Sequence, residues 1–170
     1  GLGIPAEPLF RSLSITENSV PGSNGKGGGV YLTTCSDGTY SYSTNFRNCM
    51  VTNNVSSSVG GGIFINSGYC YTSTISGNSA SSFGGGIYMS YGSIQQSEIT
   101  GNTSPKTAGL YSNREYSNPN NTIKYCTISS NISTGTTGDD IIGGIFGKNT
   151  DITNCVITNN VGSYGGVYRS

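Results

Sequence analysis

Short stretches of alternating hydrophobic and polar residues recur along the chain, and one pattern returns six times. Each copy joins a β-branched residue, a hydroxyl residue, a variable residue and an asparagine, as in Ile75-Ser76-Gly77-Asn78. The six asparagines are Asn18, Asn54, Asn78, Asn102, Asn131 and Asn160. Alternation with a period of two predicts half-buried strands, and recurrence of one motif predicts a solenoid of stacked coils.

The asparagines are spaced 36, 24, 24, 29 and 29 residues apart. Each interval accommodates two or three short strands, and the variable excess belongs in loops. A helical repeat is excluded because 27 glycines and many β-branched residues cannot sustain a 3.6-residue period. We therefore predict an all-β fold, a parallel β-helix of about six coils with uncapped ends, in a single domain spanning residues 1–170.

Three inward-facing columns follow from counting back from each asparagine. Eight residues before it stand Phe10, Phe46, Cys70, Ile94, Ile123 and Ile152. Five before it stand Leu13, Cys49, Ser73, Ser97, Cys126 and Cys155. Three before it stand Ile15, Val51, Ile75, Ile99, Ile128 and Ile157. Coils stacked in register would turn each column into a ladder with rungs about 4.8 Å apart.

The asparagines themselves have a structural interpretation, because stacked side-chain amides form a hydrogen-bonded ladder at a turn. A second signature lies between consecutive asparagines: a small residue or glycine, an aliphatic residue and an aromatic residue, as in Gly86-Ile87-Tyr88. The glycine marks either a close approach to the neighbouring coil or a positive φ.

Adjacent strand residues face opposite sides, so one of the two apolar ladders in this signature must point away from the core. The aliphatic phase continues inward at Leu32, Ile65 and Met89, which places the aromatic residues outside. We predict that this aromatic ladder is an interface unless loops or glycans cover it or it is buried at a corner. Its members are Tyr31, Phe64, Tyr88, Tyr111, Phe146 and Tyr168.

Segments such as Ile75 to Tyr88 resemble the paired glycine-glycine-aliphatic and phenylalanine-x-x-asparagine repeats of the chlamydial polymorphic outer-membrane proteins. They are also similar to the wider class of right-handed parallel β-helices that includes autotransporter passengers and pectin-lyase-like folds. Isoleucine or valine replaces the phenylalanine in all six copies, and the one literal match, Phe146 to Asn149, lies outside the asparagine column. The resemblance implies a right-handed β-helix on a cell surface.

Composition is consistent with that location. Only 9% of residues are charged, the net charge is zero and histidine is absent, so the sequence offers no electrostatic surface for nucleic acid or an anionic membrane. No apolar window is long enough to span a bilayer, and the chain begins Gly-Leu-Gly, which suggests a processed or excised chain. We expect a secreted or cell-surface protein without membrane insertion.

Five cysteines leave at least one unpaired or bonded to another chain. Cys126 and Cys155 would lie one above the other, either as a disulfide or as a buried thiol stack, and Cys35 would lie near Cys70. Zinc is not expected because the chain has no histidine and no close cysteine pair. We predict no cofactor and no metal.

Three insertions interrupt the coils, at residues 36–44, 112–121 and 134–140. They are polar, and the first two carry tyrosine, which suits binding of a glycan or a protein but also fits tolerated bulges. Four glycosylation sequons begin at Asn54, Asn102, Asn120 and Asn131. Asn120 is the best candidate because the other three belong to the asparagine column.

An enzyme is not predicted, because the carboxylates do not converge and the one adjacent pair, Asp139 and Asp140, would point to opposite sides. Arg11, Arg47 and Lys124 share a column without a carboxylate partner. An ice-binding surface is disfavoured because Met50, Glu98 and Val156 interrupt the column beside the outward hydroxyl residues.

The two ends of the chain continue the repeat into each other. Joining Ser170 of one copy to Gly1 of the next would place Val167 and Phe10 13 positions apart, the interval that separates Leu110 from Ile123. We therefore predict an extracellular structural protein, a subunit of a cell-surface filament or stalk built by head-to-tail stacking of identical chains. A segment of a longer surface protein, an adhesin segment and a carbohydrate-binding or carbohydrate-active β-helix remain the alternatives.

Overall fold

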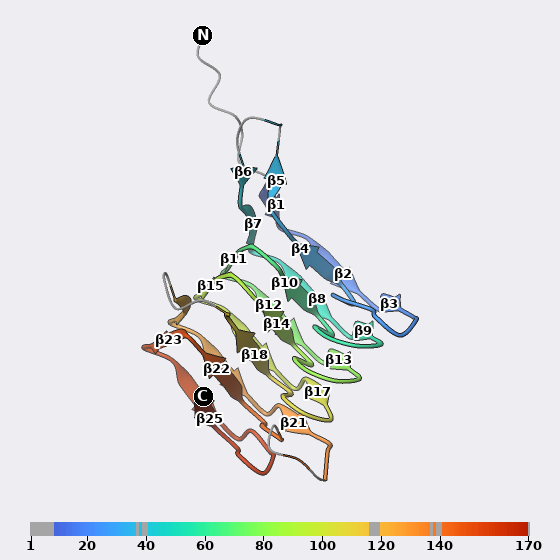
Figure 1. Cartoon of the computed structure of the whole chain (residues 1–170), viewed down its shortest axis with the longest axis vertical. Helices are drawn as coiled ribbons and strands as arrows, with labels where there is room; N and C mark the ends of the chain where they lie inside the picture. The colour runs from blue at the N-terminus through green and yellow to red at the C-terminus, as the bar shows by residue number, and fades with distance from the viewer. Residues whose placement is uncertain are drawn as a thin grey trace.

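The computed structural model describes residues 9–36, 38, 41–115, 120–136, 138 and 141–169. Its coils stack along the long axis of the molecule, from the N-terminal end to the C-terminal end (Figure 1). A complete coil passes through four strands, and each strand pairs in parallel with its equivalent in the adjacent coils. The parallel β-helix of about six coils is confirmed.

The strands belong to four parallel sheets, numbered here in the order in which a coil visits them. Sheet 1 contains β1 (Leu9–Arg11), β7 (Thr44–Arg47), β11 (Gly68–Tyr71), β15 (Gly92–Gln95), β19 (Asn121–Lys124) and β23 (Thr150–Thr153). Sheet 2 contains β2 (Ser14–Thr16), β8 (Met50–Thr52), β12 (Thr74–Ser76), β16 (Glu98–Thr100), β20 (Thr127–Ser129) and β24 (Val156–Thr158).

Sheet 3 contains β3 (Ser19–Val20), β9 (Val55–Ser56), β13 (Ser79–Ala80), β17 (Thr103–Ser104) and β21 (Ile132–Ser133). Sheet 4 contains β4 (Val30–Leu32), β10 (Ile63–Ile65), β14 (Ile87–Met89), β18 (Leu110–Asn113), β22 (Ile145–Lys148) and β25 (Val167–Arg169). The first insertion adds an antiparallel hairpin of β5 (Cys35–Ser36) and β6 (Ser41–Tyr42).

The register confirms the predicted inward columns. Phe46 pairs with Cys70, and Ile75 pairs with Ile99, so equivalent residues lie directly above one another. In the middle coils these side chains are fully buried. The core is therefore a set of continuous ladders rather than one cluster of mixed contacts.

The asparagine ladder is also present, at the corner between sheets 2 and 3, which we call the asparagine corner. The side-chain amide of Asn78 donates to Oδ1 of Asn102 at 3.0 Å and to the Val51 carbonyl at 2.9 Å. The amide nitrogen of each preceding asparagine donates to the next one in the same direction, from Asn18 to Asn160. The residue before each asparagine has φ between 55° and 64°, as at Gly77.

The corner between sheets 1 and 2 contains a feature that the sequence pattern did not predict. Its first residue has a positive φ in every coil, and in none is it glycine: Ser12, Asn48, Thr72, Gln96, Tyr125 and Asn154. The pairing of the flanking strands imposes this conformation even on residues that do not favour it, such as Thr72, Gln96 and Tyr125.

The glycines before sheet 4 show both predicted reasons for glycine, a positive φ and a close approach to the next coil. Gly60 has φ of 66°, whereas a Cβ on Gly62 would lie 2.8 Å from the Gly86 carbonyl oxygen of the next coil. Glycine therefore allows adjacent coils to approach closely before sheet 4.

Candidate functional site

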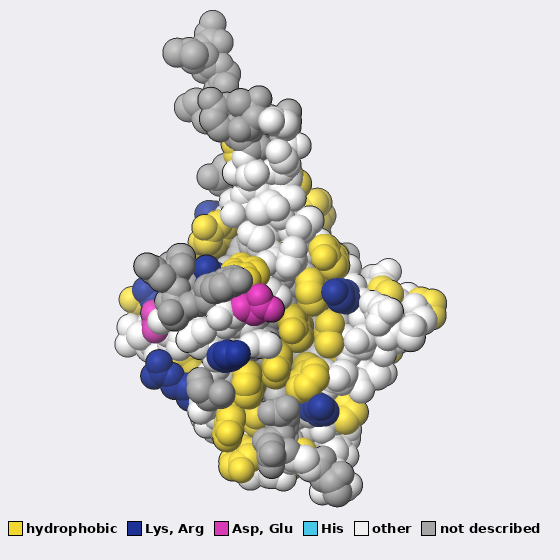
Figure 2. Space-filling model, viewed as in Figure 1, with side chains coloured by type: hydrophobic (Ala, Val, Ile, Leu, Met, Phe, Trp, Pro, Cys, Tyr) yellow, Lys and Arg dark blue, Asp and Glu magenta, His cyan; other side chains and the backbone are white. Residues whose placement is uncertain are grey.

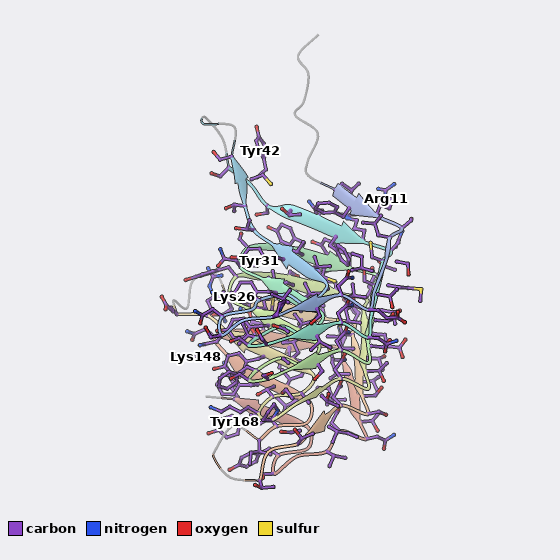
Figure 3. The ribbon with its side chains drawn as sticks, turned by 90° about the vertical axis from the view of Figure 1, so that its right-hand side faces the viewer. Arg11, Lys26, Tyr31, Tyr42, Lys148 and Tyr168 are labelled. Carbon is purple, nitrogen blue, oxygen red and sulfur yellow. The ribbon has the colours of Figure 1, made fainter. Side chains whose placement is uncertain are left out.

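The predicted aromatic ladder lies on sheet 4, with its rings pointing away from the core. Neighbouring ring centroids are separated by 4.6 to 5.8 Å and neighbouring planes by 11° to 27°. The aliphatic residues beside them, such as Ile63 and Ile87, are fully buried. Figure 3 shows Tyr31 and Tyr168 near opposite ends of the same side of the molecule, with Lys26 and Lys148 between them.

The aromatic ladder is only partly exposed to solvent. Tyr31 is 50% exposed, but Phe64 and Phe146 are only 5% and 7% exposed. The spacing between coils equals a ring-stacking distance, so each ring covers the faces of its neighbours. Lys26 also lies 5.1 Å from the Phe64 ring centroid, and Phe83 lies 4.5 Å from that of Tyr111.

Figure 2 shows a band of hydrophobic side chains along the molecule, with Lys and Arg side chains beside it. The aromatic residues point away from the core as predicted, but stacking buries two of the six, so the ladder is not exposed along its whole length. Whether the ladder is an interface stays a prediction.

A groove lies at the corner between sheets 4 and 1, which we call the insertion corner because two of the three insertions occur there. The groove has a volume of about 500 Å³. Residues from four successive turns of the helix contribute to it, including residues of both insertions at this corner; among them are Asn66, Tyr69, Tyr91, Ser93 and Arg114. The sequence pattern did not reveal this site, because its lining comes from segments far apart in the chain.

Two tyrosines form the apolar part of this corner groove. Tyr69 projects outward from β11, is 37% exposed and stacks on Tyr71 with ring centroids 5.9 Å apart. Tyr91 lies under the guanidinium of Arg114, whose Cζ is 4.6 Å from the ring centroid. Arg114 Nη1 also donates to Asn121 Oδ1 at 3.5 Å, which fixes the guanidinium over the ring.

The polar part of the corner groove consists of hydroxyl and amide groups. Ser93 is 5% exposed and accepts a hydrogen bond from the Gln95 side chain at 3.1 Å. Asn66 Nδ2 donates to Thr33 Oγ1 at 3.4 Å, and Asn120 Nδ2 donates to Asp151 Oδ1 at 3.0 Å. These contacts hold the amide groups while their remaining hydrogen-bonding capacity stays available.

All five cysteines carry free thiols in the structure, so neither predicted pairing is formed. Cys126 donates to the Ile94 and Lys124 carbonyls, and Cys155 makes equivalent contacts one coil later, which is the thiol-stack alternative. Cys35 is exposed on β5, whereas Cys70 is buried in the core. Burial raises the pKa of Cys70 to about 12 and that of Cys126 to about 11.

Three of the four sequons are not available in the folded chain. The side chains of Asn54, Asn102 and Asn131 are fully buried and their amide nitrogens donate within the ladder. These candidates are corrected, because a glycan would break the ladder. Asn120, in the second insertion, is partly exposed and remains a candidate.

The structure brings together no group of three or more metal-ligating side chains within its described ranges. The Asp139–Asp140 pair lies outside the described residues. Arg11 and Arg47 share a column as predicted, and Arg47 lies over the Tyr71 ring with its Cζ 4.7 Å from the centroid.

In the part of the chain that the structure describes, no helix has the length and apolar character needed to cross a membrane.

The first and last described coils differ from the middle coils in burial. Phe10 is 48% exposed, whereas its equivalent Phe46 is fully buried. Val167 is 47% exposed, whereas Ile145 is fully buried. The hairpin of β5 and β6, which carries Tyr42, projects beyond the first coils (Figure 3).

Comparison with known proteins identifies a family repeat in the middle of the chain. Residues 72–90, about one coil from β12 to β14 with parts of its neighbouring corners, match the Chlamydia polymorphic membrane protein repeat. No curated protein and no solved structure matches the chain. The resemblance seen in the sequence is thus confirmed for this coil.

Proposed function

We propose that the chain is a structural segment of an extracellular surface rod, in which its β-helix stacks head to tail with further copies. The match of one coil to a membrane-protein repeat supports a surface location. The proposal is a structural role and includes no catalytic step.

The direction of the asparagine ladder is the observation that carries this proposal. Every donor amide points toward the C-terminal coil, from Asn18 through to Asn160. Among the described residues, no group donates to Oδ1 of Asn18. A second copy placed after the last coil would present that oxygen to the backbone and side-chain amides of Asn160. The ladder therefore favours head-to-tail rather than head-to-head contact.

The glycine of the last coil supports the same arrangement. A Cβ on Gly86 would lie 2.7 Å from the Gly109 oxygen, and one on Gly109 would lie 2.5 Å from the Gly144 oxygen. At Gly166 a Cβ would meet nothing within 4 Å. Glycine at this position is explained if another coil covers it.

A single substitution tests the stacking. Gly166→Ala adds one methyl group that the isolated coil accommodates but a stacked coil does not. We expect the wild-type chain, in reducing buffer, to show a molar mass that rises with concentration in light scattering and rods in electron micrographs. Gly166→Ala should remove both, and its Tm should equal that of the wild-type chain at concentrations where the wild-type chain is monomeric.

The matched control is Ser81→Ala, at an exposed position on the side of the coil stack. It should associate like the wild-type chain. A wild-type chain that stays monomeric at every concentration would refute stacking, as would a Gly166→Ala chain that still forms rods.

A further inference from the structure

The corner groove differs from the rest of the repeat in the side chains that it presents. By register, Tyr69 is equivalent to Asn45 in the preceding coil and to Ser93 in the following coil. A large ring therefore lies beside a small, buried serine, and both residues line the groove. The fold does not require a tyrosine at this position, because its equivalents in adjacent coils are polar.

We propose that the corner groove binds an oligosaccharide of neutral pyranose sugars. A tyrosine ring offers a flat apolar surface for the C–H face of a sugar ring. Hydroxyl and amide groups beside it can donate to and accept from the sugar hydroxyls. Tyr69 and Tyr91 supply the rings, and Asn66, Ser93 and Asn120 supply polar groups.

The charge of the corner groove argues against other ligand classes. Arg114 is the one charged residue among its described lining residues, and its guanidinium already contacts Tyr91 and Asn121. The described lining contains no carboxylate that would attract a cation. A volume of about 500 Å³ also lies within the usual range for small-ligand sites, roughly 300–1,000 Å³, and suits a disaccharide portion of a longer chain.

The side chains that line the corner groove are held in place by the fold itself. Tyr69 and Ser93 project from β11 and β15, which are paired in register over four residues. The Tyr69–Tyr71 stack and the Arg114–Tyr91 contact restrict the rings further. A rigid site loses little conformational entropy on binding, which favours measurable affinity for a weakly binding sugar.

Calorimetric titration of the folded chain tests this proposal. The neutral probes are cellohexaose, xylohexaose and chitohexaose. A galacturonic acid hexamer serves as the negatively charged comparison ligand. We expect saturable binding of at least one neutral probe, a loss of ten-fold or more in affinity for Tyr69→Ala, and near wild-type affinity for Tyr69→Phe. The Tm of each variant confirms that it is folded.

Tyr125→Ala is the matched control, because Tyr125 is 58% exposed at the corner between sheets 1 and 2, away from the groove. It should bind like the wild-type chain. Absence of saturable binding to every neutral probe would overturn the proposal, and so would binding of the acidic probe alone or an equal loss in Tyr125→Ala. Repeating the titration with Gly166→Ala keeps the result independent of stacking.

Discussion

The asparagine corner and the insertion corner connect strands of the same coils, yet they obey different constraints. At the asparagine corner each connection between sheets 2 and 3 contains two residues, and the second is always asparagine. At the insertion corner the connection has two residues in one coil, Asn66 and Ser67, but runs from residue 33 to 43 in the preceding coil.

Hydrogen bonding explains this difference. The amide of an asparagine in the ladder must reach the next coil, so every coil needs the same length at this corner. The turn residues at the insertion corner make no such continuous ladder among the described residues. Length and side-chain identity can change there without breaking the stack, and a binding site can therefore develop.

The largest expected effect is the difference in stability between Asn78→Ala, at the asparagine corner, and Asn66→Ala, at the insertion corner of the same coil. Asn78→Ala removes the acceptor of the Asn54 backbone N–H and the side-chain donor to the Val51 carbonyl, both at a fully buried position. It should lower the free energy of unfolding by about 3 kcal/mol.

Asn66→Ala removes one long hydrogen bond at a partly exposed position and should cost less than about 0.5 kcal/mol. Urea denaturation of both variants measures the contrast. Equal losses would show that the two corners are not energetically different.

An intermediate effect concerns pH and the thiols buried on sheet 1 and at its junction with sheet 2. The pKa of Cys70 is raised to about 12 by burial, from 9.0 for the free thiol, so the folded state excludes the thiolate while the unfolded state forms it above pH 9. The contribution of Cys70 to the free energy of unfolding is therefore fully present below pH 9 and decreases between pH 9 and 12. The slope from Cys70 is about 1.4 kcal/mol per pH unit.

Urea denaturation across this pH range measures that slope in the wild-type chain and in Cys70→Ala. Cys70→Ala should have a slope smaller by about that amount, even though the cavity lowers its stability at neutral pH. Cys35→Ala is the control because Cys35 is exposed. A slope unchanged in Cys70→Ala would contradict the burial argument.

The smallest effect concerns the corner between sheets 1 and 2. Thr72 is β-branched and has φ of 49°, a conformation that costs such a residue about 1–2 kcal/mol. Thr72→Asn should raise the free energy of unfolding by about 1 kcal/mol, because asparagine tolerates this conformation better and already occupies the equivalent positions 48 and 154.

Thermal unfolding of Thr72→Asn measures this gain. Thr74→Asn, two residues later on β12, provides a control in extended backbone and should not be stabilised. A destabilised Thr72→Asn chain would mean that the threonine makes contacts worth more than its backbone strain.

The sequence predicted those parts of the fold that repeat in every coil. The inward columns through Ile75 and Ile99, the amide ladder and the outward direction of the aromatic residues all follow from one register. The positive φ at Gln96 was not predictable, because hydrogen bonding between coils overrides the local preference of the residue.

Features that combine unlike segments were also missed. The burial of Phe64 depends on rings one coil away and on Lys26. The corner groove depends on Tyr91 and on Tyr69, whose equivalents in the neighbouring coils are the polar residues Asn45 and Ser93. A tyrosine within a column of polar residues was the sequence feature that could have indicated this groove.

Two successive coils, ending at Asn78 and Asn102, contain 24 residues each and meet their neighbours through the same register. Duplication of one such unit in a gene would therefore lengthen the rod by one rung and leave every existing contact surface intact. The number of coils therefore sets the length of the β-helix, which can change in steps of about 4.8 Å without any new packing arrangement.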